Sequence, residues 1–447
     1  MGAVGRSAAA AVRCAEGAGV AWTCARSCSV RPCLPATMSE ESAVRFRVFT
    51  LNCWGIRYLS KCCRERYEMI VQLLSQEKYD VVLLQEVWSE QDYHFLKSKL
   101  INTQPYSVYF RSGAIGSGLC VFSRYRITDS FLYRYSLNGY PYKFHHGDWF
   151  GGKSVGLVIL HIQGVVVHVY VTHLHAEYCR EKDDYLPHRL LQAWELGQFI
   201  RHTGKTANVT ILGGDLNMHP SDLGNRLLQC CTGMKDSFLE TAKFEGCEGG
   251  CTLLSQNCFA SVTDSQSFPS GIRIDYVLYK GSRGFPVACE HLTTTSGTAP
   301  GKNIPYSDHE AVCATLCVQK DGNAVNGMRH GEETDPQLVD ILNEARAEVK
   351  VGIHGAEKVR YSSGRMAILG FILLLLEVVI AIIPLVVTTA ENSFPKVSFY
   401  ILGMVAFAVA LLAGILYVFH TIEVKMLQGT EDQMRNAIQA LQEQLGH

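Results

Sequence analysis

Polar side chains follow several apolar runs in this chain of 447 residues, at the points where predicted strands end. Asn52 follows the run 46–51, and Glu86 follows the run 81–85. Asp308 and His309 are adjacent and lie near the end of the region whose composition is that of a soluble domain. An amide, a carboxylate and an Asp-His pair gathered at strand ends predict a catalytic site, with groups that could cleave a phosphoester.

Hydrolysis of a phosphoester needs a cation beside the phosphate, an activated water and donors for the growing negative charge. Carboxylate and amide oxygens without Cys or His ligands favour a hard ion such as Mg²⁺. We expect Glu86 to bind this ion directly, and Asn52 to contribute either directly or through water. The sequence therefore predicts a magnesium site at these two residues.

His309 is the predicted general base, because a neutral imidazole can take a proton from water near physiological pH. Such a base needs a carboxylate that fixes its tautomer, and Asp275 in the segment 273–276 is the expected partner. Asp308 is expected nearer the metal or the attacking water. Each residue alone is more often a cap or a surface pair, so the prediction depends on their combination.

Asp215 and Asn217 follow a third apolar run, 209–214. They are two positions apart, so on a continuing strand both side chains would point to the same face. We therefore expect them to contact water and phosphate together.

The overall composition narrows the class of protein. A net charge of −1 and a pI near 6.9 argue against a protein that holds nucleic acid through its bulk field. The 17 cysteines include no Cys-x-x-Cys pair, so the spacing typical of zinc sites is missing. A disulfide framework is not expected in a chain this large, and the vicinal pairs Cys62-Cys63 and Cys230-Cys231 predict free thiols in a reducing compartment.

Strand-like runs alternate with helical stretches over residues 45–318, with helices expected at 63–75 and 189–202. Mixed sheets with helices outside fit this pattern better than an all-parallel sheet. The glycine-rich segment 116–118 lacks the Gly-Lys-Ser/Thr ending of a P-loop, so we interpret it as a hairpin turn. The runs joined through Gln163-Gly164 predict another hairpin, and the expected strands are 46–51, 80–85, 118–123, 155–161, 165–172, 208–213, 273–279 and 311–318.

Two long apolar runs follow the soluble region. The first has 24 residues, which at about 1.5 Å each reach roughly 36 Å and can span a bilayer. Neither run has the polar face expected of a helix buried in a soluble protein, and the seven residues 390–396 between them require a hairpin. The predicted organisation is an N-terminal extension (1–44), a catalytic domain (45–318), a linker and juxtamembrane helix (319–365), transmembrane helices (366–389 and 397–419) and a cytosolic helical tail (420–447).

The charges around these runs predict their orientation. The segment between the runs carries Lys396 beside Glu391, whereas the domain side of the first run carries Lys350, Lys358, Arg360 and Arg365. The positive-inside rule therefore predicts a cytosolic catalytic domain. We expect the membrane to be the endoplasmic reticulum, the plasma membrane or both. Glu377, near the middle of the first run, is interpreted as protonated or paired within the helices rather than as a site for a lipid or partner.

Residues 1–37 are rich in Ala, Arg and Cys, with Glu16 as their single acid. This composition is that of a mitochondrial transit peptide, but no clear amphipathic period accompanies it. We favour a disordered extension from an upstream start codon, because Met38 immediately precedes the first strand-bearing segment.

The motifs resemble those of the DNase I-like endonuclease/exonuclease/phosphatase superfamily over about residues 45–318. The matching blocks are Leu83-Leu84-Gln85-Glu86, Gly214-Asp215-Leu216-Asn217, Arg273-Ile274-Asp275-Tyr276 and Ser307-Asp308-His309. The resemblance implies a four-layer α/β sandwich, dependence on Mg²⁺ and in-line attack on phosphorus. It also places His173 where the superfamily keeps a histidine that donates to phosphate, whereas His175 is expected to be structural.

Within this superfamily, further motifs resemble neutral sphingomyelinases, and the paired apolar runs resemble their membrane-anchored short form. These motifs are Asn52-Cys53-Trp54-Gly55, Glu86-Val87-Trp88-Ser89-Glu90, 116–123, Gly147-Asp148-Trp149-Phe150 and Thr172-His173-Leu174-His175-Ala176-Glu177-Tyr178. Related enzymes keep an Asp and, five positions later, a Lys as a switch beside the active site, and Asp148 and Lys153 match that spacing.

This resemblance implies hydrolysis of sphingomyelin to ceramide and phosphocholine, with lysophospholipids as an additional substrate class and no nucleic-acid partner. Trp54, Trp88, Trp149 and Phe150 could line a rim that enters the lipid interface, although Trp54 and Trp88 fit a core role equally well. The helical tail offers apolar positions for self-association. The alternatives are a nucleic-acid or inositol phosphate hydrolase with the same catalytic residues, and a membrane-anchored scaffold, which the intact catalytic set disfavours.

Overall fold

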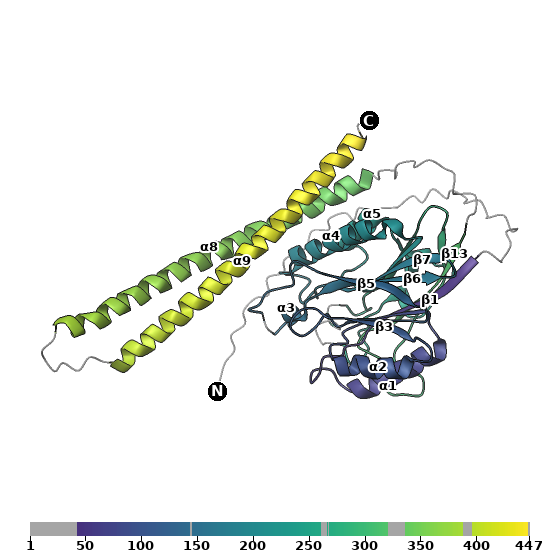
Figure 1. The fold of residues 1–447 in the computed structure, drawn as a ribbon, viewed down its shortest axis with the longest axis horizontal. Coiled ribbons are helices and arrows are strands. Elements are labelled where there is room, and N and C mark those ends of the chain that lie inside the picture. The colour runs from purple at the N-terminus through teal and green to yellow at the C-terminus, as the bar shows by residue number, and fades with distance from the viewer. Residues whose placement is uncertain are drawn as a thin grey trace, which may run out of the picture. The chain divides into compact units, whose positions relative to one another are not determined.

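Two β-sheets lie face to face, and helices cover the outer face of each sheet (Figure 1). The computed structural model describes residues 43–143, 145–260, 266, 268–320, 336–387 and 396–445. Most of the predicted N-terminal extension, most of the linker and the connection between the two apolar runs lie outside these residues. The four-layer α/β sandwich confirms the predicted fold class.

The first sheet has seven strands, and its interior strands have apolar side chains on both faces. Its order is β10-β12-β13-β1-β2-β4-β3, with β1 parallel to β2 and antiparallel to β13. Both faces of such strands are covered, which explains their continuous apolar runs. The bounds are β1 (Ala43–Asn52), β2 (Val81–Gln85), β3 (Tyr106–Phe110), β4 (Leu119–Ser123), β10 (Phe244–Glu245), β12 (Val287–Thr294) and β13 (Val312–Gln319).

The second sheet has six strands in the order β5-β6-β7-β8-β11-β9. β6 and β7 form the antiparallel hairpin predicted through Gln163-Gly164, and β7 runs parallel to β8. The segment 116–118 lies in the connection between antiparallel β3 and β4, as its interpretation as a turn predicts. The bounds are β5 (Ile127–Arg134), β6 (Ser154–Ile162), β7 (Val165–His173), β8 (Val209–Asp215), β9 (Lys235–Asp236) and β11 (Asp275–Gly281).

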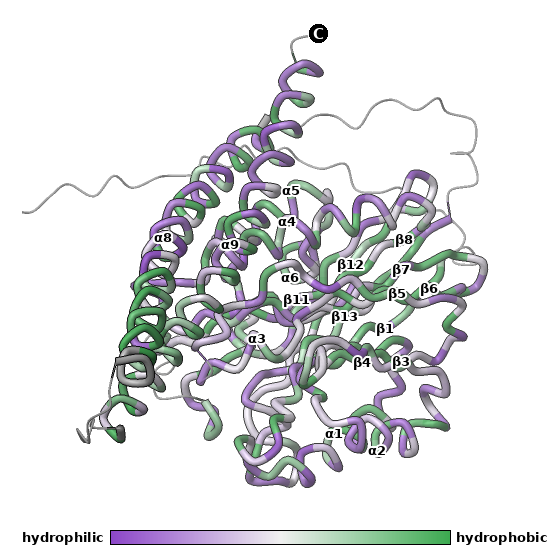
Figure 2. The backbone as a smooth tube through the Cα atoms, turned by 60° about the vertical axis from the view of Figure 1, so that its left-hand side comes forward, coloured by the Kyte–Doolittle hydropathy of each residue, from purple (hydrophilic) through white to green (hydrophobic). Residues whose placement is uncertain are grey.

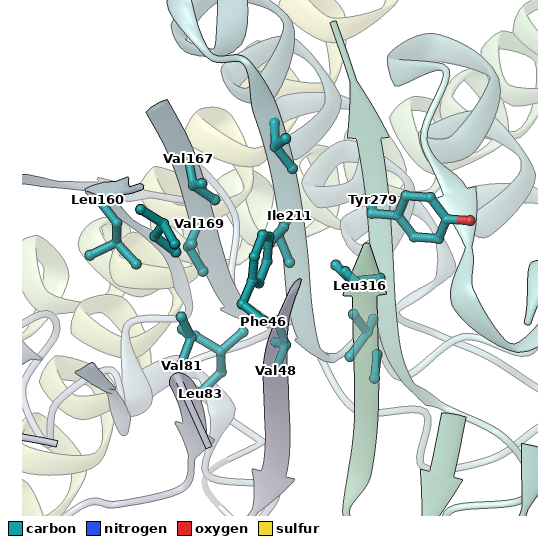
Figure 3. Packing of buried hydrophobic residues seen from close by; sticks show 14 of the residues in the cluster. Phe46, Val48, Val81, Leu83, Leu160, Val167, Val169, Ile211, Tyr279 and Leu316 are labelled. Atoms are coloured by element: carbon teal, nitrogen blue, oxygen red, sulfur yellow. The ribbon is translucent and has the colours of Figure 1, made fainter. Parts of the chain in front are cut away.

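The alternation of side chains along β1 shows how one strand serves two cores. Phe46 and Val48 point between the sheets, where they pack with Ile211 of β8 (Figure 3). Phe49 and Leu51 belong instead to the cluster beneath the helices of the first sheet. Each strand therefore joins two apolar layers, and this packing fixes the strand ends that carry the polar residues.

Helices α1 and α2 cover the first sheet, and α4 and α5 cover the second (Figure 1). Their bounds are α1 (Cys63–Glu77), α2 (Glu90–Leu100), α4 (Leu186–Thr203) and α5 (Leu223–Thr232), with short helices α3 (Asp148–Gly151) and α6 (Ser237–Glu240) and 3₁₀ turns at Gly204–Thr206 and Glu248–Gly250. Each of the eight strands and two helices expected from the sequence overlaps an observed element.

The C-terminal region consists of two long antiparallel helices, α8 (Pro336–Val387) and α9 (Lys396–Leu445). They approach closely: a Cβ added to Gly370 would lie 2.9 Å from the Cβ of Ala410. Each is long and apolar enough to cross a membrane. Figure 2 shows the hydrophobic colouring along the part of α8 remote from the C-terminus, whereas the parts near the C-terminus are largely hydrophilic. The juxtamembrane helix and first apolar run thus form one continuous helix, as do the second run and the tail.

The polar ends of these helices pack against the catalytic domain. Leu342 and Val349 of α8 and Leu427 of α9 join a buried cluster with Leu190 of α4 and Leu227 of α5. The two long helices are therefore part of the packing of the catalytic domain, because they cover the apolar outer face of α4 and α5.

Candidate active site

Strand ends from both sheets meet at one edge of the sandwich. Asn52 is the last residue of β1, and Glu86 follows β2. In the second sheet Asp215 ends β8 and lies in register between two neighbours, His173 on β7 and Asp275 on β11. Nδ2 of Asn52 donates to Oδ2 of Asp215 at 3.0 Å, which joins the two sheets through their polar residues.

Asn52 also holds Glu86 in place. Its amide nitrogen donates to Oε1 of Glu86 at 3.1 Å, and its carbonyl oxygen accepts from the Trp54 backbone N–H at 3.0 Å. Ionised carboxylates only accept hydrogen bonds, so the amide nitrogen must face them. The carbonyl oxygen retains a second lone pair, so both the direct and the water-mediated contribution of Asn52 remain predictions.

Glu86 has a φ of 57°, a left-handed conformation that is costly outside glycine and is typical of functional sites. Nε1 of Trp88 lies 3.4 Å from Oε2 of Glu86. The pKa of Asp308 is raised to about 6, chiefly by burial and also by the charge of Glu86, against the opposing effect of His309. Neighbouring carboxylates that repel each other form an oxygen donor set that suits a hard divalent cation.

His309 and Asp275 form the pair predicted from the sequence. Nδ1 of His309 and Oδ2 of Asp275 are 2.8 Å apart, and both side chains are buried. Burial alone would lower the pKa of His309, but the charge and hydrogen bond of Asp275 outweigh it, so this pKa is raised well above its ordinary value. Because Nδ1 is engaged with Asp275, Nε2 is the ring nitrogen available to the cavity.

Asp215 stands beside this pair. The ligand atoms of Asp215, Asp275 and His309 all lie within 4.8 Å of one another, so this group also could hold a metal ion. An ion there would compete with the existing hydrogen bond between Asp275 and His309. The pKa of Asp215 is raised to about 7, first by burial and then by the charge of Asp275.

Asn217 reaches the same cavity by a different route from the one predicted. The strand ends at Asp215, and Asn217 has a φ of 48°, so the chain turns instead of continuing. The Asn217 backbone N–H donates to Oδ1 of Asp215 at 2.9 Å, which closes this turn. Its side-chain nitrogen donates to the carbonyl oxygen of Leu174 at 3.0 Å. The two residues lie together because of a side-chain turn, not because of strand alternation.

Lys153 and Asp148 form a buried ion pair. Nζ of Lys153 lies 3.1 Å from Oδ1 of Asp148, 2.7 Å from Nε2 of His173 and 2.9 Å from the Leu174 carbonyl oxygen. Burial, and then the charge of Lys153, lower the pKa of His173 well below its ordinary value. His173 is therefore neutral, with Nε2 accepting from Lys153. Its Nδ1 carries the proton, and this buried atom has no hydrogen-bond partner among the described residues.

A cavity of about 880 Å³ contains nine of the ten predicted site residues in its lining; the exception is Asp275, which lies behind His309. Trp88 lines this cavity, whereas Trp54 is not in the lining and packs on Phe259 and Arg66. Trp149 is 39% exposed and, like Phe150, is outside the lining. The sequence missed other lining side chains, His146, His219 and Phe268, because no strand end or motif marks them.

Comparison with known proteins places this site in a family. Residues 49–309 match the Endonuclease/Exonuclease/phosphatase family. The chain is 48% identical to sphingomyelin phosphodiesterase 2 of Rattus norvegicus, over 90% of this chain and 93% of that protein. It is 45% identical to sphingomyelin phosphodiesterase 2 of Homo sapiens over the same shares. It is 32% identical to the inositol phosphosphingolipids phospholipase C of Schizosaccharomyces pombe, over 63% of this chain and 70% of that protein.

Among solved structures, sphingomyelinase C from Streptomyces griseocarneus is similar with a TM-score of 0.48 and 20% identity, over 61% of this chain and 99% of that one. The family match covers more than half of the chain, and the rat and human relatives are matched along nearly their whole lengths. The chain therefore belongs to the endonuclease/exonuclease/phosphatase family and, within it, to the sphingomyelin phosphodiesterases.

Proposed function

We propose that this chain hydrolyses sphingomyelin to ceramide and phosphocholine, with Mg²⁺ as its cation. The observation that carries the proposal is that one cavity contains both the Glu86 carboxylate and the free ring nitrogen of the His309–Asp275 pair. A cation and a base that face the same cavity are what attack of water on a phosphodiester requires.

Glu86 and Asp308 would hold the cation, and Asn52 would hold Glu86. The oxygen donors in this part of the cavity fit Mg²⁺, which takes few protein ligands and retains waters. The bound ion would supply positive charge for the phosphate oxygens and lower the pKa of nearby groups. That effect would offset the raised pKa of His309, which without it favours the charged imidazolium.

His309 takes the proton from the attacking water through Nε2. Asp275 keeps the proton on Nδ1 and stabilises the imidazolium that forms. Asp215, joined to Asn52 at 3.0 Å, orients the water from the side of the second sheet. In-line attack breaks the bond between phosphorus and the ceramide oxygen, which takes a proton from solvent to give ceramide. Phosphocholine leaves with the oxygen of the attacking water.

Lys153 and Asn217 are the proposed donors to the phosphate, and both line the cavity, where negative charge grows in the transition state. The role predicted for His173 as a donor does not fit its tautomer, because its Nε2 accepts from Lys153; we propose that His173 instead holds Lys153 in place. Lys153 is 2% exposed and is held by Asp148, so its charge is fixed in position before substrate arrives. Asp148 therefore acts by orienting the lysine.

The paired helices α8 and α9 are proposed to anchor the domain to the cytosolic face of the endoplasmic reticulum, the plasma membrane or both. The apolar side chains of α8 between 368 and 382 are largely exposed, as lipid-facing side chains would be. The cationic flank 350–365 favours the cytosolic side. Lysophospholipids that share the phosphocholine headgroup are proposed as additional substrates, and the polar end of α9 as a surface for self-association.

The test compares the full-length chain in detergent on three substrates: sphingomyelin micelles, an inositol phosphosphingolipid and DNA. We expect phosphocholine release from sphingomyelin with Mg²⁺ and none in EDTA. Glu86→Gln should abolish Mg²⁺-dependent turnover. Glu90→Gln is the matched control, since Glu90 is close in sequence but exposed and paired with Arg111. Full activity in EDTA would contradict the metal proposal, and cleavage of another substrate in preference to sphingomyelin would reassign the function.

A further inference from the structure

A buried polar cluster joins the anchor helix α9 to the N-terminal part of α4. His188 of α4 and His420 and Glu423 of α9 are each at most 2% exposed. Nε2 of His188 lies 2.9 Å from Oε1 of Glu423, and Nδ1 of His420 lies 2.5 Å from Oε2 of the same carboxylate. Glu423 is only four residues beyond the apolar run 397–419, or about 6 Å along the helix. The cluster therefore lies next to the proposed membrane segment.

The hydrogen bonds of His188 determine its tautomer. The Gly139 backbone N–H donates to Nδ1 of His188 at 3.1 Å, so Nδ1 carries no proton. The proton is on Nε2 and is donated to Glu423. Glu423 consequently fixes the tautomer of His188 whose Nδ1 can accept the hydrogen bond from the Gly139 backbone N–H. Glu423 and His188 are separated by 235 positions in sequence.

Gly139 begins a short path to the active site. Its φ is 79°, and an added Cβ would lie 2.4 Å from Nε2 of His175. The backbone at Gly139 therefore packs directly against the His175 ring, with no room for a side chain. The neighbouring Asn138 donates through Nδ2 to the backbone oxygen of Asp148. Asp148 in turn holds Lys153 at 3.1 Å. A series of hydrogen bonds therefore connects the anchor helix to Lys153, and its only covalent link is the step from Gly139 to the neighbouring Asn138.

We propose that Glu423 and His188 are positioning residues for the wall segment 137–143 and 145–148, of which residues 145–148 line the cavity, and for the Asp148–Lys153 pair. This inference rests on the proposed function, because it assigns Lys153 a role in turnover. It makes the anchor helix a structural part of the active site in addition to its role as a tether. The effect of each residue is partial, because Gln192 holds the same wall independently by donating to the Leu137 carbonyl oxygen at 2.9 Å.

The test uses full-length protein and detergent-dispersed sphingomyelin, so that tethering to a bilayer does not contribute. Glu423→Ala and His188→Gln should each lower kcat by roughly 3- to 30-fold with little change in KM, the usual range for residues that act through others. The double variant should lose no more than the worse single variant, because both changes cut the same path. Losses that multiply would contradict a shared path.

Two matched variants distinguish positioning of the cavity wall from the general packing of α9 on α4. His188→Asn retains an acceptor near the place of Nδ1, so it should lose less activity than His188→Gln, which does not. Gln433→Ala removes a different hydrogen bond between α9 and α4, to Trp194 Nε1 at 2.9 Å, that does not lead to the cavity wall. We expect Gln433→Ala to keep wild-type kcat. Equal losses in Gln433→Ala and Glu423→Ala would overturn the proposal.

Hydrogen exchange gives a readout that does not depend on activity. The Gly139 amide should exchange faster in Glu423→Ala and His188→Gln than in the wild type, and at the wild-type rate in Gln433→Ala. Unchanged exchange in both path variants would overturn the inference. If wild-type protein releases no phosphocholine, the proposed function fails, and the exchange rates still decide whether Glu423 positions the wall. If Glu423→Ala does not fold, the comparison of His188→Asn with His188→Gln gives the same decision.

Discussion

Two buried histidine–carboxylate pairs in this protein have nearly the same geometry and different surroundings. His309 lies 2.8 Å from Asp275 in the cavity, and His188 lies 2.9 Å from Glu423 between α4 and α9. The surroundings of the second ring nitrogen differ between the two pairs. The second nitrogen of His309 faces the cavity, whereas that of His188 accepts a hydrogen bond from the Gly139 backbone N–H. Only the first pair can exchange a proton with a substrate or water; the second can only hold the chain in place.

The largest predicted effect is at His309. His309→Ala should lower kcat by roughly 10²–10⁴-fold, the usual cost of a lost general base. Asp275→Asn should cause similar damage, because it no longer fixes the tautomer. The measurement is steady-state phosphocholine release from micelles, with the thermal unfolding midpoint as a check on the fold. A loss at His309 no greater than at His188 would remove the distinction between the two pairs.

A smaller loss is predicted for Asn52, which holds the proposed metal ligand Glu86. Asn52→Ala should weaken activation by Mg²⁺ by about 10- to 100-fold, as is common when the partner of a metal ligand is removed. The assay is the Mg²⁺ concentration for half-maximal rate, with saturating Mg²⁺ restoring most of kcat. An unchanged requirement for Mg²⁺ would show that Asn52 does not support the ligand.

The pH dependence of the Mg²⁺ requirement should be set by Asp308 in the cavity. Asp308, with a pKa of about 6, becomes protonated as the pH falls from 7 to 5 and then offers no charge to a cation. The Mg²⁺ requirement should therefore rise by up to about 10-fold per pH unit below 6, since protons and metal compete. Asp308→Asn should remove this dependence at the expense of rate. A dependence retained in Asp308→Asn would assign the titration to another group.

Stability should respond in opposite directions in the two regions. The folded pKa of Asp215 is raised to about 7, so the stability associated with its protonated form is present at low pH and is lost as pH rises through that value. Asp215→Asn should therefore raise the unfolding midpoint in EDTA at pH 8. Glu423→Ala should lower the free energy of unfolding by about 1–3 kcal/mol, because it leaves two buried imidazoles without their acceptor. Destabilisation by both variants would contradict this contrast.

The sequence predicted the cavity better than it predicted the elements around it. Asn52, Glu86 and Asp215 could be found because each follows an apolar strand, and the chain ends each strand at the same edge. The position of Asn217 was predicted for the wrong reason, because its turn depends on a hydrogen bond from its own backbone to Asp215. Sequence periodicity does not contain such local side-chain bonds.

Strands interrupted by polar residues and amphipathic helices were harder to predict. β5 and β12 escaped prediction because polar residues interrupt both, and most of their side chains are only partly buried or exposed. α2 and α5 were also missed. The pairing of His188 with Glu423 had no sequence signal at all, since two residues so far apart meet only through the packing of α9 on α4.

This packing changes how the anchor should be tested. Truncation near residue 330 would remove the proposed membrane segments, but it would also remove Glu423 and expose Leu190 and Leu227, which α8 and α9 cover. Single substitutions in the full chain are therefore the cleaner test of the anchor.

Hydrolysis of sphingomyelin in water enriched with ¹⁸O tests the central claim most directly. If water activated by His309 attacks phosphorus, the label should enter phosphocholine, and the ceramide should contain none. The full-length chain with Mg²⁺ should give this pattern, and His309→Ala should form the same labelled product much more slowly. Label in ceramide, or no cleavage of sphingomyelin by a folded protein with Mg²⁺, would contradict the proposed chemistry.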